Sequence, residues 1–289
     1  MTRLKSSDIY LIDTTLDQYD RTLLKRTGQN LLGLACLACG VSQEELSPVV
    51  LRSPVAVVPI TYGLGEIKGF AQMVKAIVSH LGFPAFVTKA KDIAGLAESY
   101  ASQANILMLA DDDSFLAINL TERRIIDNAL ATGMAYATAL NQMSGGLSGK
   151  EVLVIGCGRV GESAASALVN LGAKVSVYDL EHKCAQKLAQ KLSAGKGPDI
   201  KVVKNLEDAM VDHQLLLDAS PAADLIQEHH ITPHTFVAAP GVPHGVNPRA
   251  LVKLGERFIH DPLQLGVATM AVGACALVDF GSTNRPTVE

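Results

Sequence analysis

The segment VLVIGCGRVGE, near the middle of the chain, limits the possible folds more than any other. The apolar run Val152–Ile155 has the length and composition of a buried strand, and Gly156, Gly158 and Gly161 follow it in the spacing G-x-G-x-x-G. A second apolar run, KVSVY, is followed directly by Asp179, 23 residues after the first glycine. Dinucleotide-binding folds place an acidic residue roughly 20 residues after this turn. The order strand, glycine turn, helix and strand therefore predicts a dinucleotide site.

Each glycine has a separate role in such a turn. Gly156 permits the tight bend, Gly158 lets the backbone approach a pyrophosphate, and Gly161 allows the helix to pack closely on the strand. The free N–H groups and the dipole of the helix N-terminus favour the negative charge of the pyrophosphate. Arg159 and Val160 lie within the same turn, so we expect them to contribute to the cofactor site.

Asp179 indicates which dinucleotide is bound. Its carboxylate would accept hydrogen bonds from a ribose and repel a 2′-phosphate, and no arginine follows it directly, which favours NAD over NADP. Two later apolar runs end in small residues and prolines, among them Ser220, Pro221 and Pro240. Each proline alone is equally consistent with an ordinary turn. Taken together, these residues favour the interpretation that they form one wall of the cofactor cleft.

The hydrophobic periodicity predicts an α/β protein of more than one domain, because 289 residues exceed the roughly 100 to 150 of a typical single domain. Residues 1–147 read as N-terminal helices followed by a small parallel α/β unit, which would form the substrate domain. Residues 148–265 read as a doubly wound, Rossmann-type NAD-binding domain. Residues 266–289 begin with an apolar helix that we expect to pack back across the domains.

Composition excludes several classes of function. A net charge of -4 and 4% aromatic residues without Trp provide neither a basic surface nor stacking platforms for nucleic acid. The longest uncharged apolar run has 14 residues, fewer than the roughly 18 to 20 of a membrane span. We therefore expect a small-molecule substrate. The odd number of cysteines and the polar start of the chain predict a cytoplasmic protein, with the pair Cys36 and Cys39 buried in a helix.

The first domain offers polar groups where its strands end. Thr61 and Tyr62 follow one apolar run and Asp111 follows another, so we expect these three to face the crevice between the domains. Asp112 and Asp113 are more typical of a solvated loop, or of a cap for the segment SFLAINL. Adjacent residues of an extended chain face opposite sides, so the three carboxylates are not expected to share a metal ion.

The second domain adds the carboxylate Asp261, which is either a substrate ligand or a cap of the last helix. One carboxylate from each domain would suit a substrate that carries ammonium groups. Among the histidines only His244, after APGVP, remains a weak candidate, and we find no His/Cys cluster with convincing metal-ligand spacing.

The order of these motifs resembles the pyrrolysine-biosynthesis dehydrogenase family, the methylornithyl-lysine dehydrogenases. The resemblance runs from about Val55 to the final helix through VVPIT, GFPAFVT, ILMLADDDSFLAIN, EVLVIGCGRVG, APGVP and DPLQLGVATM. Its most specific parts are LADD with FLAIN, and the carboxylate-Pro-Leu segment before the last helix.

The resemblance implies an NAD-dependent oxidoreductase that performs the last step of pyrrolysine biosynthesis. Such an enzyme oxidises the terminal amine carbon of L-lysine-Nε-(3-methyl-D-ornithine). The imine then loses ammonia through attack by water, and the ornithyl α-amine captures the aldehyde with loss of water, which closes the pyrroline ring. The family further implies a homodimer and an N-terminal helix that closes over the substrate.

The family motifs carry substrate contacts onto Thr61 and Asp111. A family glutamate falls on Asp261, which is one methylene shorter, and a family serine falls on the bulkier Tyr62. These departures concern the pose of the substrate and not the reaction. Asp111 and Asp261 are the catalytic candidates, because an alkyl ammonium with a pKa near 10.4 must lose a proton before oxidation. The sequence does not distinguish which of three groups is the base, namely Asp111, Asp261 or a water molecule.

Two other functions are consistent with parts of the sequence. One is an NAD(P)-dependent dehydrogenase for a cyclic imine, such as a dipicolinate precursor, or for methylene-tetrahydrofolate. A folate enzyme needs a catalytic lysine, whereas Lys68 and Lys75 lie in an ordinary amphipathic pattern. The other is a non-catalytic module that senses NAD. The polar residues at the strand ends favour the enzyme.

Overall fold

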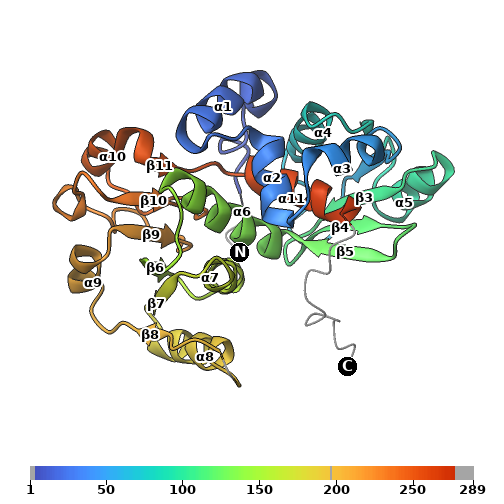
Figure 1. The fold of residues 1–289 in the computed structure, drawn as a ribbon. Helices are drawn as coiled ribbons and strands as arrows, with labels where there is room; N and C mark the ends of the chain where they lie inside the picture. The colour runs from blue at the N-terminus through green and yellow to red at the C-terminus, as the bar shows by residue number, and fades with distance from the viewer. Residues whose placement is uncertain (1–3, 196, 277–289) are drawn as a thin grey trace.

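The computed structural model describes residues 4–195 and 197–276, and it begins with three helices (Figure 1). The predicted N-terminal helices are present and include α1 (Ile12–Thr27) and α2 (Leu31–Cys39), which are separated at Gly28, whose φ of 73° ends α1. A third helix, α3 (Gln43–Val50), was not predicted. Ser42 and Glu45 begin it with a capping box, in which each side chain bonds the other residue's backbone N–H.

The first sheet has five strands in the order β2-β1-β3-β4-β5. The predicted parallel α/β unit is formed by three strands, β1 (Val55–Val58), β2 (Ala85–Val87) and β3 (Ile106–Ala110), which are connected through α4 (Phe70–His80) and α5 (Asp92–Ala101). Two unpredicted strands, β4 (Phe115–Asn119) and β5 (Arg124–Asp127), extend the sheet in antiparallel fashion. The segment SFLAINL is thus mainly strand β4, with alternate residues buried, and the hypothesis that Asp112 or Asp113 caps it as a helix is wrong.

Helix α6 (Asn128–Met143) leads from the first sheet to the second. Its first turn is capped by Asp127, whose side chain accepts hydrogen bonds from the N–H groups of Ala129 and Leu130. The glycine pair after the helix, Gly145 and Gly146, adopts positive φ angles, which are typical of residues that end a helix.

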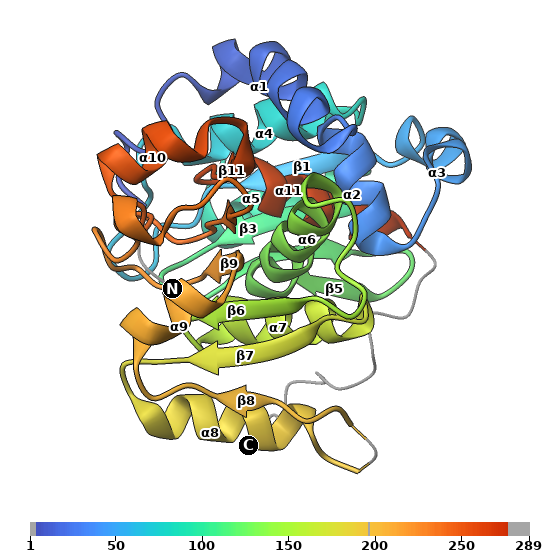
Figure 2. The same ribbon diagram turned by 60° about the vertical axis from the view of Figure 1, so that its left-hand side comes forward.

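The second sheet has six parallel strands in the order β11-β10-β9-β6-β7-β8 (Figure 2). The connections run from β6 to one edge and then return to the other side of β6, so the prediction of a doubly wound sheet is confirmed. Its strands are β6 (Glu151–Ile155), β7 (Lys174–Tyr178), β8 (Lys201–Val202), β9 (Leu215–Asp218), β10 (Phe236–Ala238) and β11 (Phe258–Ile259). Its helices are α7 (Arg159–Asn170), α8 (His182–Leu192), α9 (Leu206–Asp212), η1 (Glu228–His230), α10 (Pro248–Leu254) and η2 (Gly255–Arg257).

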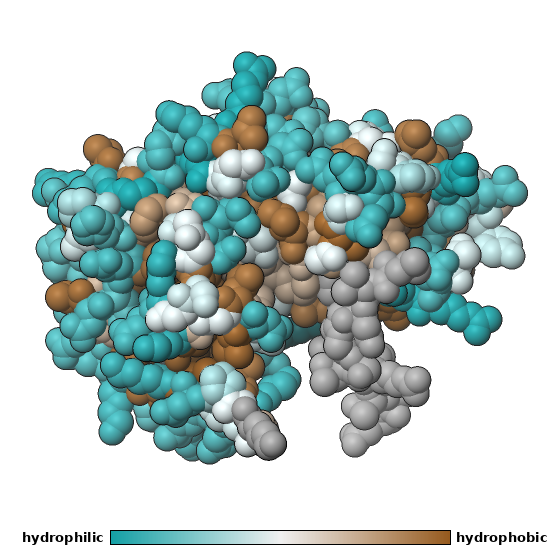
Figure 3. Space-filling model, in the orientation of Figure 1, coloured by the Kyte–Doolittle hydropathy of each residue, from teal (hydrophilic) through white to brown (hydrophobic). Residues whose placement is uncertain are grey.

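The last described helix, α11 (Gln264–Cys275), is buried along its whole length and packs against α2, α4 and α6. Residues 277–289, which belong to the predicted C-terminal region, lie outside the described residues. No helix of the described chain combines the length and the apolar character that a membrane crossing requires. Hydrophilic residues cover most of the surface seen in Figure 3, and apolar side chains show mainly towards its middle.

Candidate functional site

A cavity of about 730 Å³ lies between the two sheets, where the carboxyl ends of their parallel strands face each other. The first sheet lines it with residues that end β1 and β3, and the second sheet with residues that follow β6, β7, β9 and β10. Ligands of open α/β sheets bind at such strand ends, where the connections reverse direction. This cavity is therefore the candidate site.

The glycine turn has the geometry of a phosphate cradle. Gly156 adopts a φ of 89°, and a Cβ on Gly161 would overlap the carbonyl oxygen of Gly156. A Cβ on Gly158 would meet nothing within 4 Å, so space is open above the first turn of α7. Gly156, Gly158, Arg159 and Val160 all line the cavity. The residues present thus fit a dinucleotide pyrophosphate at the start of α7.

Asp179 lies beside this turn and also lines the cavity. Its Oδ2 accepts a hydrogen bond from the Cys157 N–H at 2.7 Å, and its Oδ1 accepts one from the Glu181 N–H at 2.8 Å. Each carboxylate oxygen keeps a second lone pair for a ribose hydroxyl. Burial and, next, the charge of Asp179 raise the pKa of the Cys157 thiol to about 12, so this cysteine stays neutral.

Asp179→Ala tests the assigned ribose contact. We expect the Kd for NAD to rise roughly 10- to 100-fold, because hydrogen bonds to a charged group contribute about 1.5 to 3 kcal/mol. Preference for NAD over NADP should also fall, since the repulsion of a 2′-phosphate disappears. Titrations with both cofactors measure the effect, and an unchanged preference would remove this role from Asp179.

Three further predicted cofactor residues lie on the side of the glycine turn opposite Asp179. Ser220, Pro221 and Pro240 line the cavity after β9 and β10. Arg159 projects from the first turn of α7, and its Nη2 lies 2.7 Å from Oδ2 of Asp127. This ion pair joins the glycine-turn helix to the residue that caps α6.

Asp111, directly after β3, presents one carboxylate oxygen for a ligand. Its Oδ1 accepts hydrogen bonds from the N–H groups of Asp113 and Ser114 at 2.9 and 2.8 Å. Its Oδ2 has no hydrogen-bond partner among the residues that the structure describes, and Asp111 lines the cavity. The turn that holds Oδ1 therefore fixes the carboxylate and leaves Oδ2 available to an ammonium group.

Asp261 is 5% exposed and its carboxylate is fully occupied. Oδ1 accepts hydrogen bonds from Leu263 and Leu265 N–H at the start of α11, where Leu263 occupies the N-cap position, so of the two alternatives for Asp261 these contacts favour the structural one. Oδ2 accepts the hydroxyls of Tyr19 and Tyr136 at 2.6 and 3.0 Å. Burial and then Asp261 raise the pKa of both phenols well above the usual value, so they remain donors. Asp261 lines the cavity, but it lacks the free oxygen of Asp111.

The two tyrosines were missed by the sequence analysis. Tyr136 follows Asn128 and Thr132 at intervals of four residues in α6, and all three line the cavity. Polar residues at i, i+4 and i+8 lie on one face of a helix, so this spacing in an alanine-rich helix could have identified the face that lines the site. No local pattern marked Tyr19, which reaches Asp261 from α1 across 242 positions of sequence.

Thr61 and Tyr62, the predicted substrate ligands, do not line the cavity. The Thr61 hydroxyl donates to Asp92 Oδ2 at 2.6 Å, and the Tyr62 side chain is 75% exposed. Asp112, in contrast, lines the cavity and accepts a hydrogen bond from Leu64 N–H at 2.6 Å. Asp92 and Asp112 thus each accept a hydrogen bond from a backbone N–H of the loop that follows β1.

His244, the weak histidine candidate, is not part of the lining either. Its ring packs edge-on against Phe258 and His260, and burial lowers its pKa. It therefore belongs to the packing behind the loop that follows β10.

The described lining is strongly acidic. It carries one guanidinium, that of Arg159, and five carboxylates, those of Glu66, Asp111, Asp112, Asp179 and Asp261. Glu66 is paired with Lys91 at 2.8 Å at the edge of the cavity. A cleft lined by one sign of charge concentrates ligands of the opposite sign. Beyond the cofactor turn, the cavity is thus suited to a cationic substrate.

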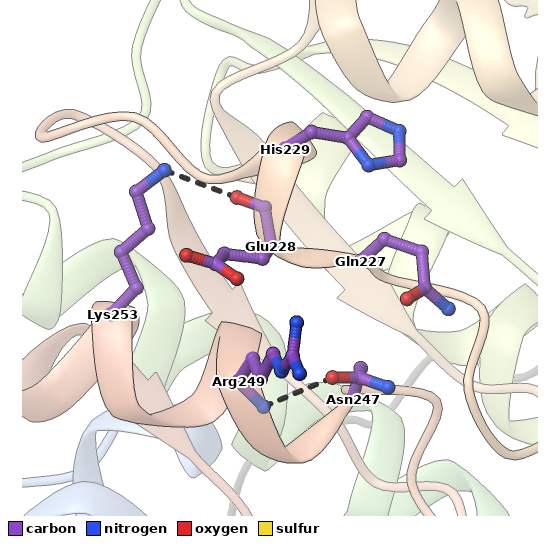
Figure 4. A pocket seen from close by; sticks show the side chains of 6 residues that line it. All are labelled: Gln227, Glu228, His229, Asn247, Arg249 and Lys253. Carbon is purple, nitrogen blue, oxygen red and sulfur yellow. Dashed lines mark hydrogen bonds between the residues drawn. The ribbon is translucent and has the colours of Figure 1, made fainter.

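A second, open pocket of about 570 Å³ lies around η1 and α10, away from the glycine turn (Figure 4). Polar and charged residues line it: Gln227, Glu228, His229, Asn247, Arg249 and Lys253. None of the predicted site residues contributes to this pocket.

Glu207, His229 and His230, beside this second pocket, place one potential ligand atom each within 4.8 Å of the others. The backbone N–H of Gln227 donates to Nδ1 of His230 at 2.9 Å, so Nδ1 carries a lone pair. In the neutral ring the proton is then on Nε2, which lies 2.8 Å from Glu207 Oε1. Nε2 therefore has no lone pair for a metal ion, and the cluster is a hydrogen-bonded group.

The chain matches two known sequence families, one in the region of the first sheet and the other in the region of the second sheet. Residues 8–126 match the sequence family described as pyrrolysine biosynthesis protein PylD, N-terminal domain, and residues 129–232 match alanine dehydrogenase/PNT, C-terminal domain. The pyrrolysine synthase of Methanosarcina acetivorans is 30% identical over 93% of this chain and 98% of its own length. That of Methanosarcina barkeri is 28% identical over 93% of this chain and 97% of its own length.

Solved structures resemble this fold at low sequence identity. Quinate dehydrogenase from Corynebacterium glutamicum, in complex with NAD, has a TM-score of 0.54 and 15% identity, and the match covers 77% of this chain and 92% of that one. Shikimate dehydrogenase from Aquifex aeolicus has a TM-score of 0.52 and 15% identity, with 79% and 95% covered. At this identity, the likeness to these two structures shows that the chain has a Rossmann-type dehydrogenase fold and shows nothing about its substrate.

Proposed function

Because the chain belongs to the pyrrolysine synthase family, we propose that it performs the last step of pyrrolysine biosynthesis as an NAD-dependent dehydrogenase. The substrate is L-lysine-Nε-(3-methyl-D-ornithine), and the oxidised position is the carbon that bears its terminal amine. The observation that carries this proposal is the acidic cavity, which joins a dinucleotide turn to the free carboxylate oxygen of Asp111.

The charge of the substrate complements the cavity. At neutral pH the substrate has three ammonium groups and one carboxylate, and is therefore a cation. Asp111 Oδ2 is the carboxylate oxygen best placed to hold the reacting ammonium, because both oxygens of Asp261 already have partners. We assign Asp111 to binding this ammonium and Asp261 to holding the cavity wall together with Tyr19 and Tyr136.

Oxidation requires the amine in its neutral form, and an alkyl ammonium has a pKa near 10.4. Asp111 accepts the hydrogen bond of the ammonium and passes its proton to solvent, to which this residue is exposed. NAD, bound at the glycine turn, supplies the hydride acceptor. The resulting imine exchanges ammonia for water, and the ornithyl α-amine then displaces that water. Overall the substrate loses one ammonia, one hydride and one proton.

The direct test mixes the protein with NAD and synthetic substrate. We expect reduced nicotinamide to form, and mass spectrometry to find a product lighter by one ammonia and two hydrogen atoms. Bound NAD without any NADH formation would overturn the proposed substrate. Cyclic imines and folates would then be the next substrates to test.

Salt dependence checks the electrostatic part of the proposal. Raising the ionic strength from about 0.05 to 0.5 M should raise the KM for the cationic substrate severalfold, because the Debye length falls below about 10 Å. The KM for anionic NAD should not rise in parallel. Steady-state kinetics at fixed pH measure both values, and a salt-independent substrate KM would contradict steering by the acidic lining.

We also propose that the protein is a cytoplasmic homodimer. The family resemblance supports the dimer, and five free cysteines are consistent with a reducing compartment. Sedimentation equilibrium of the purified protein tests the dimer.

A further inference from the structure

We propose that Asp218 is a positioning residue, which joins the two loops that hold the nicotinamide end of the cofactor. The inference rests on NAD binding as proposed above. Asp218 ends β9 and is 0% exposed. Its Oδ1 accepts hydrogen bonds from the N–H and hydroxyl of Ser220 at 3.1 and 2.6 Å. Its Oδ2 accepts one from the N–H of Gly245 at 2.8 Å, in the loop after β10.

The two loops are in direct contact, with no room for a side chain between them. A Cβ on Gly241 would overlap the carbonyl oxygen of Ser220. A Cβ on Gly245 would lie 2.5 Å from Oδ2 of Asp218 and 3.2 Å from the carbonyl oxygen of Ala222. Asp218 therefore determines how the loop after β9 and the loop after β10 lie relative to each other.

Both loops form one wall of the large cavity. Residues 219–222 and 240–242 line it, whereas Asp218 lies behind them. The order of the strands indicates which part of the cofactor this wall meets. Asp179 places the adenosine ribose beside β7, on one side of the glycine turn after β6. The dinucleotide crosses the turn, so its nicotinamide end lies on the other side, beside β9 and β10.

A buried carboxylate remains favourable only while its donors are present. Burial raises the pKa of Asp218, and the hydrogen bonds from Ser220 and Gly245, followed by the nearby His260, oppose that rise. Loss of the carboxylate would leave the N–H groups of both loops without their acceptor, and the loops would be free to shift. An error of about 1 Å in the position of a reacting group can lower the rate on the order of 100-fold.

Asp218→Asn tests this role through ligand binding. The amide nitrogen of asparagine cannot accept the hydrogen bonds that one carboxylate oxygen accepts, so one loop loses its attachment. We expect the affinity for NADH to fall about tenfold, while that for ADP-ribose, which lacks nicotinamide, stays within about twofold. Asp212→Asn, an exposed change at the end of α9, is the matched control and should alter neither affinity.

A second variant is informative if Asp218→Asn does not fold. Ser220→Ala removes the 2.6 Å hydroxyl bond to Asp218 but keeps the carboxylate, and it should weaken NADH binding more than ADP-ribose binding. Equal weakening of both ligands, or no change of either in a folded variant, would overturn the positioning role. Since these titrations contain no amine substrate, a wrong substrate assignment would appear only in the turnover assay and not here.

Discussion

Asp111→Asn is expected to lower kcat by a factor of about 100 to 10,000, the range typical for loss of a proton-transfer group. The amide still accepts hydrogen bonds from the N–H groups of Asp113 and Ser114, so the turn after β3 should persist. The charge at the free Oδ2 position is lost, and with it the hold on the reacting ammonium and the acceptor of its proton. The Kd for NAD should stay near that of the unmodified protein.

The adjacent carboxylate provides the control for this prediction. Asp113 is exposed and does not line the cavity, so Asp113→Asn removes one charge from the same turn without changing the site. Steady-state turnover and NAD titrations of both variants separate catalysis from cofactor binding. Full activity of Asp111→Asn would show that the carboxylate is structural.

Asp261→Asn is expected to lower the free energy of unfolding by about 2 to 4 kcal/mol, because it disrupts a buried, charged hydrogen-bond network. Oδ1 holds the start of α11, and Oδ2 holds Tyr19 of α1 and Tyr136 of α6. An asparagine can accept at only one of these two oxygen positions. Turnover should fall as well, since the part of the cavity wall that contains Asp261 loses its attachment.

Urea unfolding measures this effect, and the two phenols provide the control. Tyr19→Phe removes one donor to Asp261, and Tyr136→Phe removes one donor together with the acceptor of the Asp261 N–H. Both variants leave the Asp261 carboxylate and its bonds to α11 in place, so each should cost less than Asp261→Asn. The effects should not be additive in double variants, because the three residues share one network. Additive losses, or a change below about 0.5 kcal/mol for Asp261→Asn, would show that the network is not coupled.

The second sheet was predictable because its signals are local. A continuous apolar strand, glycines at fixed spacing and an acid about 20 residues further on are read within one stretch of chain. The turn itself demands Gly156, with its φ of 89°, and Gly161, beside a carbonyl oxygen. Strand β4 was harder to identify because five residues of alternating burial form a weak pattern.

The candidate site was predictable only where a residue follows a strand. Asp111 and Asp179 were identified because strand ends of parallel sheets meet at one edge. Thr61 also follows an apolar run, but its hydroxyl turns to Asp92, a choice made by a loop contact 31 residues away. The roles predicted for Asp111, Asp261 and the cofactor residues remain predictions that the variants above test.

By itself, then, the sequence determined the α/β class, the doubly wound second sheet and the family, because these depend on patterns within short segments. Only the tertiary structure decided which groups share the site. Tyr19 and Tyr136 meet Asp261 across 242 and 125 positions, and Asp218 reaches Gly245 across 27. Such contacts depend on how helices and loops pack against one another, and that packing is set by the whole core, not by any local run of residues.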